Sequence, residues 1–525
     1  MSISSRLVLV FAVLGSSLLF GGWLLGRGMR DTASPYARAH LFEDVLTHVE
    51  RYYVDSVPAS ELYDKAMTGM LEELGDPHTL YLGADRLKRL TESTSGNYTG
   101  LGVQVDVRDG WPTVLAPLPG GPAERAGLQS GDRIIEVAGK TTRGLTGDEV
   151  RGILRGPVGA TLELMVERPG SHGQLLIRVT RGEIHRKAVR RTALLGGGVG
   201  FVDVKVFSDS TELELTHAID SLSKAGMTSL ILDLRGNPGG LLAQGVDVAD
   251  LFLDEGKSIA RIKGRIPEAN RVFDDGSPQR WPALPLAVLI DEGSASASEI
   301  VAGALQDHDR AVLVGRTSYG KGSAQSLYPT AVGGALKLTT ARWFTPAGRS
   351  IDRSHVTAGS DEADRGPPAR ERFRTDAGRT VFGGGGITPD VVVGDTALSI
   401  DEMALQAALG DRVTAFRDAV TAYALELKAA GGPSRVDFTV TPDMLDGLWR
   451  TMQRRGFRFD RSVYDRASGL VSRLLARDVA RYVFGPAAEA RRSIDDDEVI
   501  QAAVSLVHGA RSQADLLARA GKKQP

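Results

Sequence analysis

The chain has 525 residues, a formal net charge of −2, 42% hydrophobic and 24% charged residues, and no cysteine. This composition is ordinary for a folded protein of several domains, and the near-zero charge gives no electrostatic case for a nucleic-acid partner. The lack of cysteine excludes disulfides, thiolate catalysis and Cys-based metal sites, but it identifies no redox compartment.

The N-terminal segment, residues 1–30, is predicted to be a signal anchor or a signal peptide. Leu7–Leu25 contains no charged residue and approaches the roughly 20 apolar residues that cross a bilayer as a helix. Gly26–Arg30 follows instead of a small-x-small cleavage site, which favours a retained anchor over a cleaved signal. Arginines on both flanks leave the orientation of this segment open.

Two predicted regions follow before the longest part of the chain. Residues 31–95 are predicted to be helical, because His40–Tyr53 and Ser60–Leu74 place apolar residues at three- and four-residue steps. Residues 96–183 alternate short strands and glycine turns, which is typical of a compact binding module. A helix is expected at Asp148–Leu154 within this module.

Residues 184–395 alternate strands with helices and predict a mixed α/β sheet. A polar stretch, Ser354–Thr380, is expected to be a surface loop, with a lid as the alternative. The strands are expected at Val199–Phe207, Ser229–Leu234, Leu284–Ile290, Ala311–Val314 and Leu336–Phe344, with helices at Glu212–Ala225 and Leu242–Leu251.

Two dense segments of this region, Gly293–Asp307 and Gly315–Gln325, hold a candidate nucleophile and base. A serine hydroxyl becomes a nucleophile when a neighbouring base takes its proton, and lysine can be that base only when its amine is uncharged. Ser296 and Lys321 are far apart in the sequence, so only the fold could bring them together. Burial would have to lower the pKa of the lysine from about 10.4.

The same segments also resemble parts of other catalytic and binding motifs. Gly315–Lys321 begins like a phosphate-binding loop, but Gly322 stands where the magnesium-binding Ser or Thr should be. His308 follows Asp307 and suggests a Ser-His pair, although the serine does not lie in a G-x-S-x-G elbow. His78 reads as a structural residue, and no HExxH or other close ligand pair predicts a metal site. No cofactor is expected.

The C-terminal region, residues 396–525, is predicted to be helical. Val463–Phe484 reads as a helix with an apolar side and a solvated arginine face. Ser493–Asp496 resembles a capping-box start for a final helix. The region is expected to support the core or to make contacts between subunits.

Several separated motifs, in order, resemble the carboxyl-terminal processing proteases, a family that cleaves protein tails with a Ser-Lys dyad beside a PDZ domain. The resemblance covers about residues 40–395. It rests on AMTGMLEELGDPHTLYL (Ala66–Leu82), VGFVDVKVF (Val199–Phe207), DLRGNPGG (Asp233–Gly240), SASASEI, GKGSAQ, LKLTTARWFTPAGRSI (Leu336–Ile351) and GITPDVVV (Gly386–Val393).

The resemblance implies a role for several residues. The family nucleophile corresponds to Ser296, its base to Lys321 and its assisting glutamine to Gln325, while an acidic residue important in some members falls on Asp307. Ser294 then reads as a turn residue and Ser298 as the cap of a helix over Glu299–Gln306. An oxyanion donor is expected from Ala297 at the helix start. The second donor, by resemblance, is Gly239 or Gly240.

The strand-rich module resembles a PDZ domain, which adds an extended peptide to a sheet edge and binds its terminal carboxylate with backbone N–H groups. The matching loop is Tyr98–Gly102, with Gly100, Leu101 and Gly102, and Val150 is expected to line an apolar pocket. The expected partner is a protein with an exposed C-terminus. Homo-oligomers and an adaptor protein stay open as further partners.

The resemblance also favours a protease on the periplasmic side of an inner membrane, either anchored there or exported and cleaved. The predicted architecture is therefore α/β and α+β, with a membrane segment, a helical region, a PDZ domain, a mixed-sheet protease core and a helical C-terminal region. A membrane-anchored PDZ scaffold with an inactive core is the alternative function; intact Ser296, Lys321 and Gln325 favour the enzyme.

Overall fold

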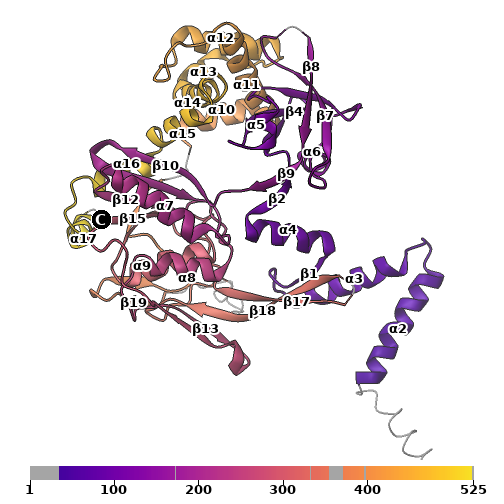
Figure 1. Cartoon of the computed structure of the whole chain (residues 1–525), viewed down its shortest axis with the longest axis vertical. Helices are drawn as coiled ribbons and strands as arrows, with labels where there is room; N and C mark the ends of the chain where they lie inside the picture. The colour runs from indigo at the N-terminus through magenta and orange to yellow at the C-terminus, as the bar shows by residue number, and fades with distance from the viewer. Residues whose placement is uncertain (1–34, 172, 332, 354–369, 395–397, 523–525) are drawn as a thin grey trace, which may run out of the picture. The chain divides into compact units, whose positions relative to one another are not determined.

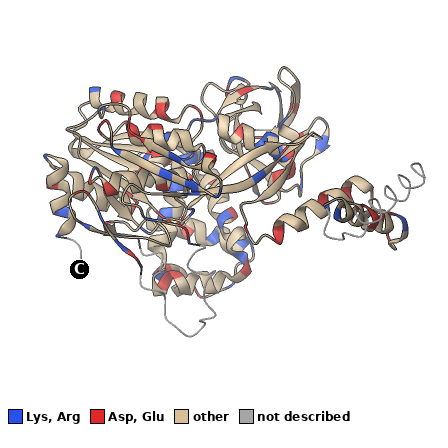
Figure 2. Cartoon of the chain, turned by 90° about the horizontal axis from the view of Figure 1, so that it is seen from below, with Lys and Arg blue, Asp and Glu red and all other residues tan. Residues whose placement is uncertain are grey.

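The computed structural model describes residues 35–522 except residues 172, 332, 354–369 and 395–397 (Figure 1). The predicted membrane segment, Leu7–Leu25, lies outside the described residues. Among the helices that are described, none is both long and apolar enough to cross a bilayer. Lys and Arg are interspersed with Asp and Glu along the helices and strands (Figure 2), in keeping with the small net charge.

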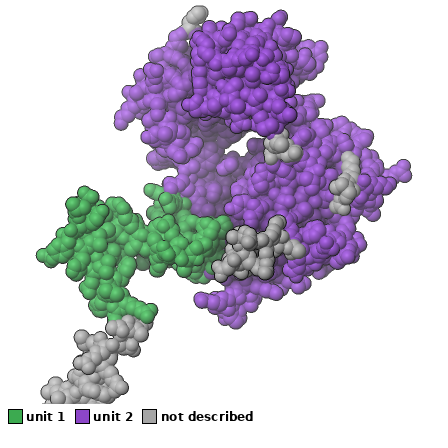
Figure 3. Space-filling model, turned by 180° about the vertical axis from the view of Figure 1, so that it is seen from behind, with its two compact units in different colours: residues 1–87, 325–339 green, residues 88–324, 340–525 purple. Residues whose placement is uncertain are grey.

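The chain divides into two units, residues 1–87 with 325–339 and residues 88–324 with 340–525 (Figure 3). Unit 1 contains the predicted N-terminal helices, as α2 (Pro35–Tyr52) and α3 (Ala59–Glu72). Its strand β1 (Leu80–Gly83) pairs antiparallel with the first half of β18 (Gly334–Phe344), so that Leu80 lies opposite Lys337.

Unit 2 begins near α4 (Ala84–Ser95) and continues into the strand-rich module. A six-stranded antiparallel sheet has the order β3-β4-β5-β7-β8, with β6 beside β5. The strands are β3 (Val103–Arg108), β4 (Trp111–Pro117), β5 (Arg133–Val137), β6 (Lys140–Thr141), β7 (Thr161–Glu167) and β8 (Gln174–Thr180), with helices α5 (Pro122–Arg125) and α6 (Gly147–Leu154). Strand β3 is therefore an edge of this sheet.

The prediction of a loop over Tyr98–Gly102 was wrong in part. Residues Asn97–Gly100 form β2, which pairs antiparallel with β9 (Gly182–His185) and leaves only Leu101 and Gly102 as the connection to β3. Tyr98 is held in this ladder opposite Ile184. Backbone pairing with β9 therefore forms a strand over most of a segment whose glycines suggested a loop.

The core of unit 2 is a six-stranded mixed sheet with the order β10-β11-β12-β15-β16-β21. Strands β10 and β11 are antiparallel, and the others run parallel. The strands are β10 (Val189–Leu195), β11 (Val199–Val204), β12 (Ser229–Asp233), β15 (Leu286–Ile290), β16 (Val312–Gly315) and β21 (Val391–Val392).

Both faces of this sheet are covered. Leu230 and Leu232 pack with the helices α7 (Thr211–Lys224), α8 (Leu242–Asp250) and α9 (Ala297–Asp307), whereas Ile231 packs on the opposite face. That second face is covered by α16 (Glu498–Val507) and α17 (Gln513–Gly521). Because neighbouring side chains of a strand point to opposite faces, both must be apolar, which explains the nearly continuous hydrophobic strands. The C-terminal helices therefore complete the core.

Further strands flank the core. The end of β18 pairs antiparallel with β13, and β13 pairs with β14. The described end of the polar insertion contributes β19 and the first residue of β20, and these two strands pair as a hairpin. These strands are β13 (Ser258–Gly264), β14 (Arg271–Asp274), β19 (Arg372–Arg374) and β20 (Thr380–Phe382). Strand β17 (Ser323–Pro329) pairs with β18.

Most of the remaining helices form a second apolar cluster that packs on the strand-rich module. Leu425 lies against Gly131 of that module, and Arg455 pairs with Asp109 at 2.6 Å. The helices are α10 (Ile400–Leu409), α11 (Val413–Ala429), α12 (Pro442–Arg454), α13 (Arg461–Arg466), α14 (Ser468–Val479) and the π-helical turn Ala480–Phe484. Helix α15 (Pro486–Asp495) follows, and its buried Ile494 packs with α16 on the core sheet.

Two local predictions for helices were wrong. Val463–Phe484 is not one helix, because α13 ends at Arg466 and α14 begins at Ser468. Arg466 and Arg473 are exposed, as predicted for a solvated face, and Arg473 pairs there with Glu402 at 2.7 Å. The capping box at Ser493 is absent, because α15 continues through that residue. The cap of α16 is instead Asp497, whose carboxylate accepts from Val499 N and Ile500 N.

Candidate active site

Three loops meet at the carboxyl ends of the parallel strands. They leave β12, β15 and β16 and carry Asn237, Ser296 and Lys321. The backbone oxygen of Asn237 accepts a hydrogen bond from Ala295 N at 3.0 Å, and Ser294 O accepts one from Tyr319 N at 3.0 Å. Ligands in open parallel sheets bind at this edge. The two dense sequence segments and the glycine-rich turn therefore belong to one site.

Ser296 is a strained residue at the end of the loop between β15 and α9. Its φ is 55° and its ψ is −114°, a region that non-glycine residues rarely adopt. The residue is the N-cap of α9 and is partly exposed. The prediction that Ser298 caps the helix was wrong, because Ser298 is buried and its hydroxyl donates to Asn237 O at 2.9 Å. Of the two, the partly exposed Ser296 is therefore the candidate nucleophile.

Glu299 joins the two dense segments. Its Oε2 accepts from Ser296 N at 2.8 Å and from Lys321 N at 3.0 Å, so the two backbone nitrogens are no farther apart than the sum of these distances. Its Oε1 accepts from Ser318 Oγ and from Gly320 N at 2.7 Å. The side chain is fully buried, and burial raises its pKa, although these hydrogen bonds act in the opposite direction. One carboxylate thus fixes both loops.

Lys321 is held from its other side by Trp343. The indole Nε1 donates to Lys321 O at 3.0 Å, and Trp343 N donates to Gly322 O at 2.9 Å. Trp343 is almost fully buried. The segment then enters β17 and not a helix, whereas a phosphate-binding loop leads into a helix N-terminus. The phosphate-loop alternative is therefore wrong.

The glycine-rich turn packs directly on Ser296. A Cβ added to Gly239 would lie 2.8 Å from Ser296 Cβ and 2.7 Å from Ala295 O, so only glycine fits there. Gly239 N donates to Asn237 Oδ1 at 2.9 Å, and Gly239 O accepts from Phe207 N at 3.0 Å. Gly240 lies opposite Phe207 in a parallel bridge. The structure thus places both predicted glycines in the turn that packs on Ser296.

Asp307 and His308 lie at the other end of α9. At about 1.5 Å of rise per residue, this helix separates Asp307 from Ser296 by roughly 15 Å. The Asp307 carboxylate is paired with the buried Arg349 and accepts from Ala347 N at 2.9 Å. Both His308 ring nitrogens are used, by Asp376 at 2.9 Å and by Ser258 O at 2.8 Å. These contacts indicate a structural role for both residues and rule out the Ser-His pair.

Gln325 belongs to unit 1, whereas Ser296 and Lys321 belong to unit 2. Its Nε2 donates to Thr339 Oγ1 at 3.3 Å, between β17 and β18. The assisting role of this glutamine stays a prediction.

The predicted peptide-binding residues lie at one end of the strand-rich module. The carbonyl oxygen of Leu101 accepts a hydrogen bond from Ala123 N, and that of Gly102 accepts one from Leu118 N, each at 2.8 Å. The predicted binding of a carboxylate therefore depends on the N–H groups of Leu101 and Gly102. Gly100 ends β2. Val150 lies on α6 beside β3, but it is buried in the core of the module with 4% exposure. In this state Val150 does not line an open pocket.

Sequence reasoning missed Glu299 and Trp343. Glu299 stands three residues after Ser296, which is the spacing of a capping box, so that pattern could have identified its bond to Ser296 N. No local pattern indicates that the same carboxylate also binds Lys321 N, because that contact depends on how β15 and β16 pair. Within the described ranges, His, Asp and Glu form no cluster suited to a metal ion.

Two family models match the chain, Peptidase family S41 over residues 198–359 and PDZ domain over residues 113–168. The carboxy-terminal-processing protease of Bartonella bacilliformis is 39% identical over 326 residues, which cover 61% of this chain and 74% of that protein. The carboxy-terminal processing protease CtpA of Bacillus subtilis is 32% identical, with 67% and 75% covered.

Among solved structures, the photosystem II D1 C-terminal processing protease is 29% identical, with a TM-score of 0.36 and with 67% of this chain and 92% of that chain covered. The Bartonella and Bacillus proteins are each more than 30% identical to this chain, and the aligned region covers about three quarters of each of them. The convergent loops, the strained serine and these relatives lead to one conclusion: the chain belongs to the carboxy-terminal processing proteases of peptidase family S41.

Proposed function

We propose that the protein is a serine endopeptidase in which Ser296 is the nucleophile and Lys321 the general base. One observation carries this proposal: a single oxygen of Glu299 accepts hydrogen bonds from the backbone of both residues. Two segments that are distant in the sequence are thereby held together at the sheet edge. No described histidine is needed for this pair.

The proposed reaction follows from these groups. The neutral Lys321 amine takes the proton of Ser296 Oγ while this oxygen forms a bond to the carbonyl carbon of the substrate. The protonated amine then gives the proton to the leaving nitrogen as the C–N bond breaks, which leaves an acyl group on Ser296. Water, with Lys321 again as the base, releases the acyl group as a carboxylate and restores the hydroxyl.

We assign the oxyanion donors to the N–H groups of Ala297 and Gly240. Ala297 lies at the first helical position of α9, where N–H groups have no partner within the helix. Gly239 N already donates to Asn237 Oδ1, so it is the poorer choice. Gly239 O points toward Phe207 N, from which it accepts a hydrogen bond. In the trans peptide that joins Gly239 to Gly240, the N–H of Gly240 points opposite to this oxygen and so away from Phe207. This geometry supports Gly240 over Gly239.

The function is tested by incubating the protein with β-casein, an unstructured polypeptide, and following cleavage by mass spectrometry. The Ser296→Ala variant should lose cleavage by about 10³-fold or more while retaining its melting temperature. Ser505→Ala, at an exposed serine of α16, should cleave like the wild type. Equal cleavage by Ser296→Ala would contradict the nucleophile, and peptide binding without cleavage by the wild type would favour the scaffold alternative.

We further propose that the PDZ domain binds the C-terminal tail of the substrate along the free edge of β3, beside α6. Backbone N–H groups at Leu101 and Gly102 would donate hydrogen bonds to the terminal carboxylate, which loses its charge on amidation. Two fluorescent peptides of the same sequence, one with a free C-terminus and one amidated, should therefore differ in their affinity for the Ser296→Ala variant. The free peptide should bind at least about tenfold more tightly than the amidated peptide. Fluorescence polarisation measures both affinities, and equal affinities would refute carboxylate binding.

A further inference from the structure

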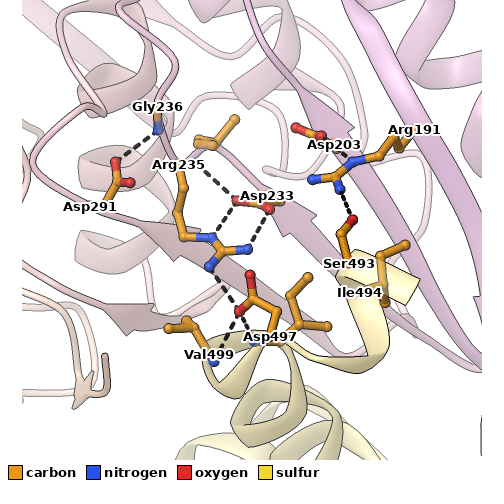
Figure 4. A network of polar contacts seen from close by, with 12 residues as sticks. Arg191, Asp203, Asp233, Arg235, Gly236, Asp291, Ser493, Ile494, Asp497 and Val499 are labelled. Atoms are coloured by element: carbon orange, nitrogen blue, oxygen red, sulfur yellow. Dashed lines mark hydrogen bonds and ion pairs between the residues drawn. The ribbon is translucent and has the colours of Figure 1, made fainter. Parts of the chain in front are cut away.

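Asp497, near the end of the chain, contacts the segment that precedes the glycine-rich turn. Its Oδ1 accepts from Arg235 NH1 at 3.0 Å, as well as capping α16 through Val499 N and Ile500 N. Figure 4 shows the Arg235 guanidinium between the carboxylates of Asp233 and Asp497. A second tether lies nearby, where Arg191 NH1 donates to Ser493 Oγ at 2.8 Å. The end of α15 and the start of α16 are thus docked on the ends of the core strands.

Arg235 is fixed on its other side by the core. Its Nε and NH2 donate to the two oxygens of Asp233 at 2.9 and 2.8 Å, and Asp233 is fully buried at the end of β12. The backbone of Arg235 is held too, because its N donates to Asp233 Oδ1 and its O accepts from Lys205 Nζ. The guanidinium therefore links a core strand to the C-terminal region by charged hydrogen bonds, which are stronger than neutral ones.

The residues after Arg235 connect this link to the nucleophile. Gly236 N donates to Asp291 Oδ1 at 2.8 Å, in the loop that carries Ser296. Asn237 is fully buried, and its backbone oxygen accepts from Ala295 N and Ser298 Oγ. A shift of Arg235 would therefore be transmitted within two residues to the loop of Ser296 and to the turn that supplies Gly240.

From these contacts we infer that Asp497 is a positioning residue for the glycine-rich turn, so that the C-terminal helices complete the protease site. The inference rests on the proposed function, because it assigns the turn to stabilising the transition state. A positioning residue of this kind should change kcat and leave KM nearly unchanged, because the turn acts on the charge that develops in the transition state. A residue that only caps α16 should change neither.

The test replaces Asp497 by Asn, which is as good an N-cap as Asp but carries no charge. We expect kcat for β-casein cleavage to fall about tenfold, with KM within about twofold of the wild type. The matched control is Asp460→Asn at the N-cap of α13, where Asp460 Oδ1 accepts from Ser462 N at 2.8 Å. This control should keep wild-type kcat and a melting temperature close to that of Asp497→Asn.

Hydrogen exchange gives a readout that does not depend on catalysis. The amides of Gly236, Asn237, Gly239 and Gly240 should exchange faster in Asp497→Asn than in the wild type and in Asp460→Asn. Wild-type kcat with unchanged exchange in Asp497→Asn would overturn the positioning role and leave the Ser296 chemistry intact. If the wild type itself did not cleave casein, the proposed function would fail, and the exchange rates would still decide whether Asp497 holds the turn.

Discussion

Replacing Lys321 by Met should lower kcat/KM for casein cleavage by about 10³- to 10⁴-fold, because methionine keeps the length of the side chain but cannot accept a proton. The fold should survive, since the backbone contacts of this residue with Glu299 and Trp343 do not involve its side chain. Initial rates with a fluorogenic peptide, together with the melting temperature, measure both effects.

The matched control for that variant is Lys257→Met. Lys257 pairs with Asp376 at 2.7 Å, in the cluster around His308 at the far end of α9. The Lys257→Met substitution also removes one positive charge, but it should leave kcat/KM unchanged. Full activity of Lys321→Met would refute the general base, whereas equal losses in both lysine variants would point to a nonspecific effect of charge.

Replacing Glu299 by Gln should lower kcat by about 10²-fold and destabilise the fold by about 1–3 kcal/mol. Glutamine has nearly the same shape, but its amide nitrogen is a donor and cannot accept from a backbone N–H. At least one backbone partner, from Ser296, Gly320 or Lys321, would then face another donor in a buried site. The loop of Lys321, and in one amide orientation that of Ser296 as well, would shift to relieve this conflict.

Steady-state kinetics and thermal unfolding separate the two parts of this expectation. Glu292→Gln is the control, because Glu292 lies in the loop just before α9 but is exposed and pairs with Arg316. It should behave as the wild type. Destabilisation of Glu299→Gln without a loss of kcat at a temperature where it is folded would show that the carboxylate supports the fold and not the reacting geometry.

Much of the mixed-sheet core could be predicted from the sequence. The apolar runs at Ser229–Leu234 and Leu284–Ile290 became β12 and β15, because buried parallel strands need apolar side chains on both faces. The glycine-rich turn and the serine segment were recognised by resemblance, and the structure places them side by side. The chemistry assigned to Ser296 and Lys321 stays a proposal.

What the sequence did not predict depends on contacts between distant segments. A strand was mistaken for a loop at Tyr98–Gly100, since its pairing with β9 leaves no local signature. The cap of α16 was placed at Ser493 and not at Asp497, because a capping box is a short pattern that also occurs by chance. The sharing of Glu299 by two loops is likewise a tertiary feature.

The central claim is that an uncharged Lys321 activates Ser296, and the pH dependence of Ser296 phosphonylation tests it most directly. The measurement is the rate at which a fluorophosphonate labels Ser296 between pH 5 and pH 11, read by mass spectrometry of the labelled peptide, with Ser296→Ala as the blank. We predict a rate that rises with an apparent pKa well below the ordinary lysine value of about 10.4 and that is lost in Lys321→Met. A rate that titrates only near pH 10, or wild-type labelling of Lys321→Met, would contradict it.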